Sequence, residues 1–528
     1  MTYLIHQSIF RTASAQPEAE ALVYRGQKLS YAALASEVQS VAGGLLSNGL
    51  GRGERVAVFL EKRLETVTAL FGVAYAGGVF VPVNPLLKPE QVGYILSDCN
   101  VRILVTSADR LKQLASVLVK CPDLHTVIIV DGADDLPHVE NPRVLPWSLL
   151  VDTSDPRKCH RIVDTDMAAI LYTSGSTGKP KGVVLSHRNM VAGAISVSSY
   201  LENTPEDRIL AVLPLSFDYG LSQLTTAFHT GATVVLMNHL LARDIVKAVE
   251  AERITGLAAV PPLWLQLADL QWPPDATIRY FTNSGGAMPR ATLDRLRAAL
   301  PKAKPYLMYG LTEAFRSTYL PPAEVDRRPD SMGKAIPNAE IMVLRPDGSE
   351  CAANEPGELV HRGALVSLGY WNDPQKTAER FKPIRPAHHG LPLVEMAVWS
   401  GDTVRRDEEG FLYFISRNDE MIKTSGYRVS PTEVEEVLYG REHVGEAAAL
   451  GIPHPTLGQA IVVVVSPRDG APLDAEKLLA ACKPHLPNYM LPNRIIVWEG
   501  SLPRNPNGKI DRKLLATQHA NIFMEESK

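Results

Sequence analysis

The part of this chain best suited to chemistry is residues 173–183, TSGSTGKPKGV, which is almost entirely Gly, Ser, Thr and Lys. Glycines let the backbone turn its N–H groups toward an anion, while hydroxyls and lysines add donors and positive charge. The composition therefore favours a polyphosphate ligand. It is not a Walker loop, because only two residues separate Gly175 from Gly178 and Pro180 follows the lysine. A flexible Gly/Ser surface loop is the alternative.

Further motifs follow in order: YGLTE at 309–313, GELVHRG at 357–363, GYW at 369–371, SGD at 400–402, SRNDEMIKTSGYRVSPTEVE at 416–435 and NPNGKIDRK at 505–513. With these motifs the chain resembles the AMP-forming adenylating enzymes, which include acyl-CoA synthetases, adenylation domains of nonribosomal peptide synthetases and firefly-type luciferases. It is most similar to stand-alone acyl-CoA ligases. The resemblance implies three ligands: ATP, Mg²⁺, and CoA or the phosphopantetheine of a carrier protein.

Apolar runs alternate with amphipathic helical patterns in the first part of the chain, which predicts an α/β protein with parallel sheets covered on both faces. After Pro346 the pattern changes to short strands with Gly and Pro turns, typical of a β-rich subdomain. We expect a large N-terminal domain over residues 1–418, with mixed and parallel sheets flanked by helices. The resemblance implies that residues 419–528 form a small, mobile α/β domain and that Asp419 is the hinge.

The resemblance also assigns the nucleotide-binding residues. Glu313 resembles the magnesium-binding glutamate, Thr312 a phosphate-contacting threonine, and Asp402 the aspartate that accepts hydrogen bonds from both ribose hydroxyls. Taken alone, YGLTE would be a loop entering a helix. The complete expected ATP and AMP set is Thr173, Ser174, Gly175, Ser176, Thr177, Gly178, Lys181, Gly286, Ala287, Tyr309, Asp402 and Arg417, of which Tyr309 packs on adenine.

Two lysines complete the expected catalytic set of Lys509, Thr312, Glu313 and Lys423. Lys509 lies in a turn-forming stretch that resembles the family segment carrying a lysine to the reacting carboxylate and phosphate. In the family the small domain then rotates and presents a loop to the pantetheine arm. The matching loop contains Lys423, Ser425 and Gly426, and the last two would line the thiol tunnel.

Segments 214–220 and 283–289 match those that line the acid pocket, for which we expect Phe217, Asp218, Tyr219, Ser284, Met308, Gly310 and Arg316. Asp218 falls where amino-acid-adenylating domains bind the α-amino group of the substrate. Asp218 and Arg316 have two interpretations with equal weight: they pair with each other, or one of them faces the substrate. In the second case the acid is short and polar, since a fatty chain would leave a buried charge unpaired.

Composition excludes other classes. The 528 residues exceed the size of one hydrophobic core, so several subdomains are expected. A net charge of −4 argues against nucleic acid as a partner. No apolar run is long enough for membrane insertion, and the N-terminal segment lacks the pattern of a secretory signal. The five scattered cysteines fit a reducing cytoplasm.

The leading hypothesis is an ATP-dependent, AMP-forming acid–thiol ligase that adenylates a short, polar carboxylic acid, releases pyrophosphate and transfers the acyl group to CoA. The alternative is a stand-alone amino-acid-adenylating enzyme that loads a carrier protein. Asp218 favours the alternative, whereas the KTSGYRVSPTEVE segment favours the acyl-CoA ligase. A luciferase-like oxygenase would need oxygen-dependent product formation. A catalytically inactive scaffold would be expected to lack residues such as Lys509 or Glu313, and this chain has both.

Overall fold

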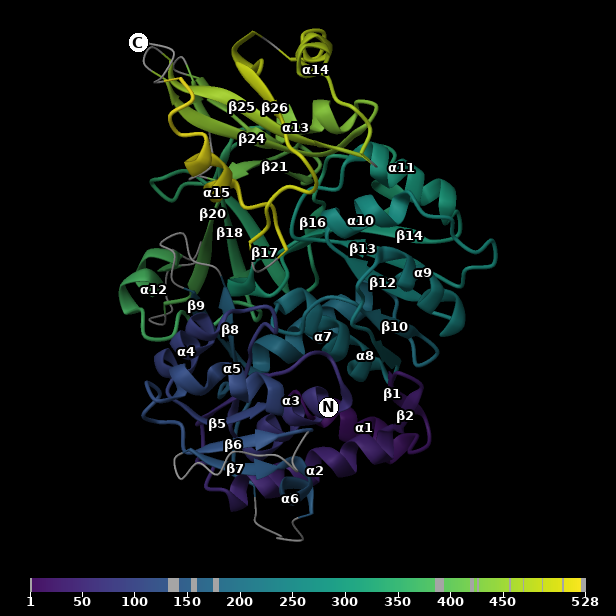
Figure 1. Ribbon diagram of the computed structural model, residues 1–528, viewed down its shortest axis with the longest axis vertical. Helices are drawn as coiled ribbons and strands as arrows, with labels where there is room; N and C mark the ends of the chain where they lie inside the picture. The colour runs from purple at the N-terminus through teal and green to yellow at the C-terminus, as the bar shows by residue number, and fades with distance from the viewer. Residues whose placement is uncertain are drawn as a thin grey trace.

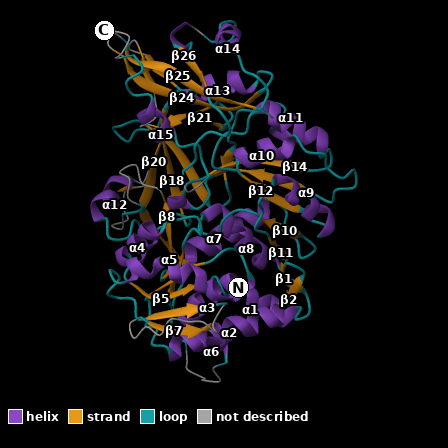
Figure 2. Cartoon of the chain, in the orientation of Figure 1, coloured by secondary structure: helices purple, strands orange, loops and turns teal. Residues whose placement is uncertain are grey.

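The structure is a computed structural model that describes residues 2–131, 142–152, 159–173, 180–384, 394–417, 422–424, 427–454, 457–468, 470–486, 488–505 and 508–523. Within these ranges the strands form four sheets, and helices cover the two large ones (Figures 1 and 2). No helix among the described residues is long and apolar enough to cross a bilayer.

The two large sheets are mainly parallel, as the alternating pattern predicts. One has the order β7 (Arg143–Pro146), β6 (Thr126–Ile129), β5 (Val101–Thr106), β3 (Arg55–Phe59), β4 (Val79–Pro82), β8 (Met167–Thr173), β9 (Lys181–Ser186). The other has the order β16 (Lys334–Ala335), β15 (Thr318–Leu320), β14 (Lys304–Tyr309), β13 (Tyr280–Asn283), β12 (Gly256–Ala259), β10 (Arg208–Ala211), β11 (Thr233–Leu236), β1 (Glu20–Tyr24), β2 (Gln27–Ser30). Antiparallel pairs occur at β8–β9, β1–β2 and β14–β15–β16.

Helices join these strands. Most of them share one apolar core with both sheets, whereas α4 and α5 pack with the seven-stranded sheet in a second apolar cluster. Local sequence signals start and stop them: the Ser30 side chain caps α2, and Gly77, in the left-handed conformation, ends α3. The helices are α1 (Gln7–Ala15), α2 (Tyr31–Ser47), α3 (Leu64–Ala76), α4 (Pro89–Asp98), α5 (Ala108–Leu118), α6 (Trp147–Val151), α7 (His187–Tyr200), α8 (Asp218–Thr230), α9 (Ala242–Ala251), α10 (Pro261–Ala268) and α11 (Arg290–Ala299).

A third sheet is antiparallel and contains β17 (Ala339–Leu344), β18 (Gly357–Gly363), β20 (Met396–Arg406), β19 (Phe381–Pro383) and β21 (Leu412–Arg417), with α12 (Pro374–Arg380) beside it. The β-rich region predicted after Pro346 therefore begins earlier, at β17. A turn signal does mark this start: Pro337 and Asn338 directly precede β17, Asn338 has φ +64°, and the Ala339 N–H donates to the Ile336 carbonyl at 3.2 Å.

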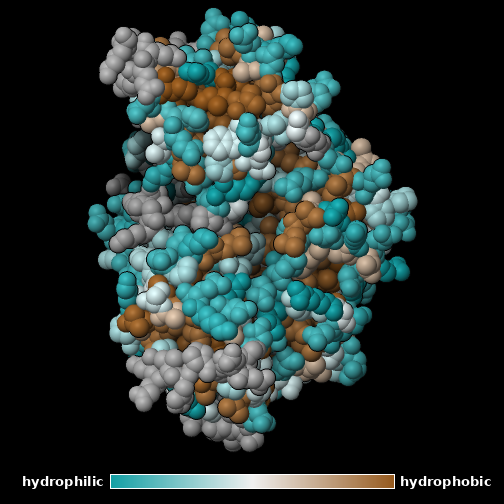
Figure 3. Space-filling model, viewed as in Figure 1, coloured by the Kyte–Doolittle hydropathy of each residue, from teal (hydrophilic) through white to brown (hydrophobic). Residues whose placement is uncertain are grey.

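The fourth sheet contains β23 (Tyr427–Val429), β22 (Ile422–Thr424), β25 (Gly458–Pro467), β24 (Val444–His454) and β26 (Arg494–Val497). It packs with α13 (Pro431–Tyr439), α14 (Ala475–Cys482) and α15 (Arg512–Gln518) around two apolar clusters of its own. Figure 1 shows this module on top of the larger body, and Figure 3 shows apolar residues gathered over its sheet. The proposed division between residues 418 and 419 falls in 418–421, outside the described residues.

Candidate active site

The predicted phosphate loop joins β8 to β9. Thr173 at the end of β8 pairs in register with Lys181 at the start of β9, so both ends of the loop lie side by side. Ser174, Gly175, Ser176, Thr177 and Gly178 lie outside the described residues. The Lys181 ammonium lies 5.6 Å from the centre of the Tyr370 ring. Burial, with the nearby Lys376 charge, lowers the pKa of Lys181.

Glu313 lies close to Lys181, in a single 3₁₀ turn, Thr312–Ala314, after β14. Its Oε1 accepts a hydrogen bond of 2.5 Å from the Tyr370 hydroxyl, and the charges of Glu313 and Lys181 interact. Tyr370 belongs to the GYW motif, but we assigned it no role from the sequence. Among the described residues, no group of three or more His, Cys, Asp or Glu side chains is arranged to hold a metal ion. A magnesium site here would thus use one carboxylate with phosphate and water oxygens, which suits that ion.

Asp402 lies in β20 and is nearly buried. One of its carboxylate oxygens accepts a hydrogen bond from the Tyr309 hydroxyl, and its backbone N–H donates to Ser400 Oγ at 3.0 Å. Asp402 also pairs in register with Arg417 of β21, whose side chain is not described. The structure therefore brings the predicted adenine and ribose residues, Tyr309 and Asp402, into direct contact.

Lys509 comes from the C-terminal module but reaches the large domain. A methyl group placed on Gly285 would lie 3.6 Å from its Cε and 4.0 Å from its Nζ. Gly285 belongs to the exposed loop after β13 that also contains Gly286 and Ala287. The Lys509 charge also acts on Asp218. In Figure 1 the yellow segment that precedes α15 extends down from the module toward this region.

Asp218 is the first residue of α8, where a negative charge interacts favourably with the helix dipole, and the preceding residue Phe217 is partly exposed. Its Oδ1 accepts a hydrogen bond of 3.2 Å from the Thr312 hydroxyl. Burial raises the pKa of Asp218, although Arg316, Thr312 and Lys509 each oppose the shift. The carboxylate therefore has Thr312 as a hydrogen-bond donor and Arg316 and Lys509 as nearby cations.

Arg316 is fully buried at the floor of this region and does not pair with Asp218. Its Nη1 donates to Ser284 Oγ at 3.1 Å, and its guanidinium carbon lies 4.7 Å from the centre of the Tyr219 ring. Among the described residues, no ion pair joins Arg316 to Asp218. The two charges interact, but the structure shows no direct ion pair between these described side chains. Met308, also buried, accepts a hydrogen bond of 3.0 Å at its sulfur from Tyr200.

A strained turn links Glu313 to Arg316. Phe315 has φ +58° and ψ −54°, and the Arg316 N–H donates across it to the Ala314 carbonyl at 2.6 Å. This is a γ-turn with positive φ, a rare conformation that costs energy. The Phe315 ring is buried against α7, where a methyl group on Gly193 would lie 2.5 Å from its Cδ1. The turn reverses the chain and thereby sets the relative positions of Glu313 and Arg316.

Three further polar groups at this site were missed from the sequence. Ser216 Oγ, Asn283 Oδ1 and Ser367 Oγ are buried and have no hydrogen-bond partner within the described part of the chain. Ser216 follows the buried strand β10, and Asn283 ends β13, so a polar residue directly after an apolar run was the signal that could have found them. Buried polar groups without partners are uncommon, and a polar ligand or water would supply the missing bonds.

Of the remaining predicted residues, some are described with their side chains and the others are not. Gly310 is partly exposed beside Arg316, and Tyr219 is buried with its hydroxyl 2.6 Å from Thr282 Oγ1. Lys423 lies in β22, but its side chain is not described. Asp419, Ser425 and Gly426 lie outside the described residues.

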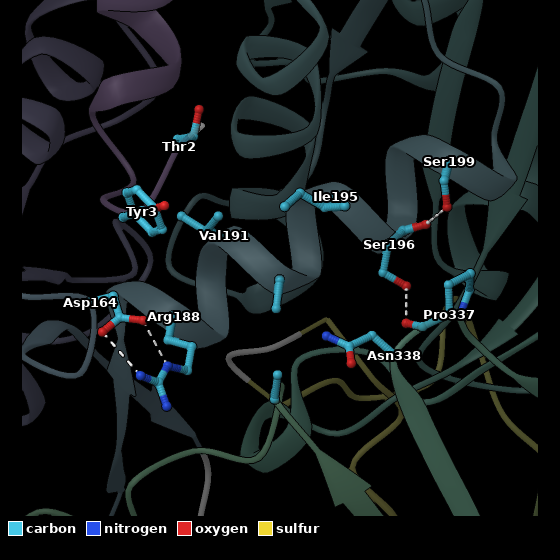
Figure 4. Close-up of a pocket in the computed structure, with 12 residues that line it drawn as sticks. Thr2, Tyr3, Asp164, Arg188, Val191, Ile195, Ser196, Ser199, Pro337 and Asn338 are labelled. Carbon is cyan, nitrogen blue, oxygen red and sulfur yellow. Dashed lines mark hydrogen bonds and ion pairs between the residues drawn. The ribbon is translucent and has the colours of Figure 1, made fainter.

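A surface pocket of about 240 Å³ lies elsewhere, along α7. Its polar side chains are already paired, with Arg188 bound to Asp164 at 2.8 Å and Ser196 Oγ donating to the Pro337 carbonyl at 2.8 Å (Figure 4). None of the predicted site residues is among its described lining residues. The pocket therefore offers a ligand few unsatisfied polar groups.

Comparison with known proteins bears on the family of the chain. It is 30% identical to an L-proline–[L-prolyl-carrier protein] ligase of Pseudomonas fluorescens, over 98% of this chain and 99% of that protein. It is 27% identical to a long-chain-fatty-acid–CoA ligase of Bacillus subtilis, over 96% of this chain and 93% of that protein. Other relatives are far longer: the chain spans 10% of a linear gramicidin synthase protein of Brevibacillus parabrevis, at 28% identity over 97% of this chain.

Solved structures agree with these relatives. ATP-bound MatB from Rhodopseudomonas palustris superposes with a TM-score of 0.85 at 26% identity, over 99% of this chain and 100% of that one. Residues 433–509 match the AMP-binding enzyme C-terminal domain, and residues 9–371 match the AMP-binding enzyme family. The chain therefore belongs to the family of AMP-binding enzymes.

Proposed function

We propose that this chain is an AMP-forming acid–thiol ligase that adenylates a short, polar carboxylic acid and passes the acyl group to CoA. The observation that carries the proposal is the approach of Lys509 to Gly285, together with its charge interaction with Asp218. The acid and the triphosphate are both anionic, so their reaction needs a cation aimed at the point where charge develops. The related fatty-acid–CoA ligase and the MatB structure with ATP support this proposal.

In the first step a carboxylate oxygen attacks the α-phosphorus, the new P–O bond forms, and the bond to pyrophosphate breaks. Lys509 would donate to the reacting oxygens. Lys181, Thr173 and the loop at 174–178 would hold the β- and γ-phosphates, and Asp402 would hold the ribose. Glu313 fits a magnesium ion, because one of its oxygens is bound by Tyr370 while no hydrogen bond within the described residues occupies the other. When bound, the ion neutralises phosphate charge.

In the second step a thiol attacks the acyl carbon, a C–S bond forms, the bond to AMP breaks, and the thiol proton passes to solvent. We propose that residues 419–528 rotate about Asp419 between the steps, which withdraws Lys509 and brings Lys423, Ser425 and Gly426 toward the thiol. The unpaired cysteines are consistent with a cytoplasmic enzyme.

A second candidate is loading of an amino acid onto a carrier protein. Asp218 favours it, since a partly exposed carboxylate at the start of α8 would bind an ammonium group. The L-prolyl-carrier-protein ligase is similar over nearly the full length of both chains. The two candidates share the adenylation step and differ only in acid and acceptor.

Carboxylate-dependent exchange of pyrophosphate into ATP tests the shared step, over a panel of amino acids, hydroxy acids, dicarboxylic acids and fatty acids. Exchange with non-amino acids, followed by thioester formation on CoA, is the expected result. Exchange with amino acids alone would favour the carrier-protein candidate. No exchange with any class, in protein that is folded by its melting profile, would contradict both.

A further inference from the structure

The Arg316 guanidinium is a buried cation whose hydrogen bonds are incomplete. Arg316 is only 1% exposed, yet Nε and Nη2 have no hydrogen-bond partner within the described part of the chain. The third nitrogen, Nη1, donates to Ser284 Oγ. Burying an arginine with two unsatisfied donors is costly, so these donors call for a partner such as a ligand, an ion or water.

The unbound atoms have a geometry that selects their partner. Nε and Nη2 lie on one edge of the guanidinium plane, and their N–H groups point in nearly the same direction. A carboxylate, with two oxygens in one plane, binds such an edge through two parallel hydrogen bonds. A hydroxyl or an amide carbonyl offers a single oxygen and would leave one donor unsatisfied.

The neighbours of Arg316 do not meet this need. Asp218 is close enough to interact by charge but forms no ion pair with Arg316 among the described residues, and its Oδ1 accepts a hydrogen bond from Thr312. Tyr219 presents its ring face, and the Tyr200 hydroxyl donates to Met308. Lys509, the other cation that acts on Asp218, adds positive charge. None of these neighbours gives the Nε and Nη2 edge of Arg316 a hydrogen-bond acceptor.

The guanidinium also lies next to a position that has no side chain. Gly310 is partly exposed, and a methyl group on it would lie 3.3 Å from Nη1 and 3.2 Å from the Arg316 Cα. Any larger residue at 310 would cover the guanidinium. The adjoining loop Gly285–Ala287, which Lys509 approaches, is exposed. Because Arg316 also bonds Ser284, the residue directly before this loop, its guanidinium lies beside the region where we expect the reacting carboxylate.

We propose that Arg316 binds a second carboxylate of the acid, so that the enzyme selects short dicarboxylic acids. This inference rests on the proposed adenylation and names its substrate class. One carboxylate of the acid reacts near Lys509, and the other occupies the Nε and Nη2 edge of Arg316. The half-amide of the same acid keeps the size of the group but loses the charge and one of the two hydrogen bonds.

The test compares malonate, succinate, glutarate and aspartate with their half-amides and with monocarboxylates of equal length, in ATP–pyrophosphate exchange. Wild-type kcat/KM should be at least about tenfold higher for one of the diacids than for its half-amide. In R316Q this preference should disappear through a higher KM for the diacid, so that kcat/KM falls more for the diacid than for the monocarboxylate of equal length. R316K should keep part of the preference, since it keeps the charge but not the planar edge.

R188Q is the matched control, because Arg188 is 53% exposed and lies on α7 with its own partner, Asp164. The acid preference of R188Q should equal that of the wild type. Equal rates for diacid and half-amide in the wild type, or an equal loss on every acid in R316Q, would overturn the inference. Calorimetric titration with the same diacids distinguishes a failure of this inference from a failure of the proposed function. Diacid binding that R316Q loses, without any exchange, would contradict adenylation and keep the Arg316 site; neither binding nor exchange would overturn both.

Discussion

Asp218 differs from a surface carboxylate because burial raises its pKa while Arg316, Thr312 and Lys509 oppose the shift. If it binds an ammonium group of an amino acid, Asp218→Ala removes a charge-assisted hydrogen bond. The expected cost is about 1.5–3 kcal/mol in kcat/KM for amino acids and almost nothing for acids without an amino group. Exchange assays with an amino acid and its desamino analogue measure this difference. Equal losses on both would give Asp218 a structural role only.

Lys62 provides a test of the buried charges outside the site. It is nearly buried and donates to the Val212 carbonyl at 2.9 Å, and burial lowers its pKa from 10.5 to about 8. The folded form therefore loses this proton at lower pH than the unfolded form. Below about pH 8 the buried charge lowers the free energy of unfolding by its full amount, about 3 kcal/mol. This destabilisation disappears as the pH rises from about 8 toward 10.5.

Lys62→Met should remove this dependence. The melting temperature of the wild type, relative to that of the variant, should rise between about pH 8 and about pH 10. Thermal melts over that range measure it, with the exposed Lys302→Met as control. A constant difference between wild type and Lys62→Met would mean that Lys62 is hydrated in the folded protein.

Among the elements, the turn at Phe315 is held by α7. The close approach of Gly193 to the Phe315 ring leaves no room for a methyl group, so Gly193→Ala should push the ring and displace the turn that carries Glu313 and Arg316. We expect the free energy of unfolding of Gly193→Ala to fall by about 1–3 kcal/mol. Its kcat should fall more than the kcat of other variants that lose the same stability. Steady-state kinetics and thermal melts measure both. The control Ile195→Ala changes the exposed face of the same helix and should leave kcat unchanged.

The elements also show what could and could not be predicted from the sequence. Apolar runs such as 55–59 and 208–211 are buried strands, because strands covered on both faces carry little polar sequence. The γ-turn at Phe315 was not predictable, since positive φ is normally a glycine property and here tertiary packing imposes it. The partner of Arg316 was not predictable either, because a sequence reveals neither the missing ion pair with Asp218 nor the bond to Ser284.

At the scale of the whole molecule, the C-terminal module has its own apolar clusters and meets the large domain through polar contacts. Glu436 accepts a hydrogen bond of 3.2 Å from the Arg290 backbone, and Arg468 lies 3.7 Å from Asp269. Such contacts are compatible with rearrangement between two steps, since a module with its own core keeps its fold when they break. The arrangement with Lys509 against the loop at Gly285 corresponds to the adenylation step of the proposal.

The most direct measurement compares the two half-reactions in wild type and Lys509→Ala. Exchange of pyrophosphate into ATP reports adenylation, and release of AMP from a supplied acyl-adenylate in the presence of CoA reports thioester formation. We expect Lys509→Ala to lower exchange by about 100-fold or more, because a cation is lost where charge develops, and to change thioester formation by only a few fold. Equal loss in both half-reactions, or unchanged exchange, would contradict the assignment of Lys509 and with it the central claim.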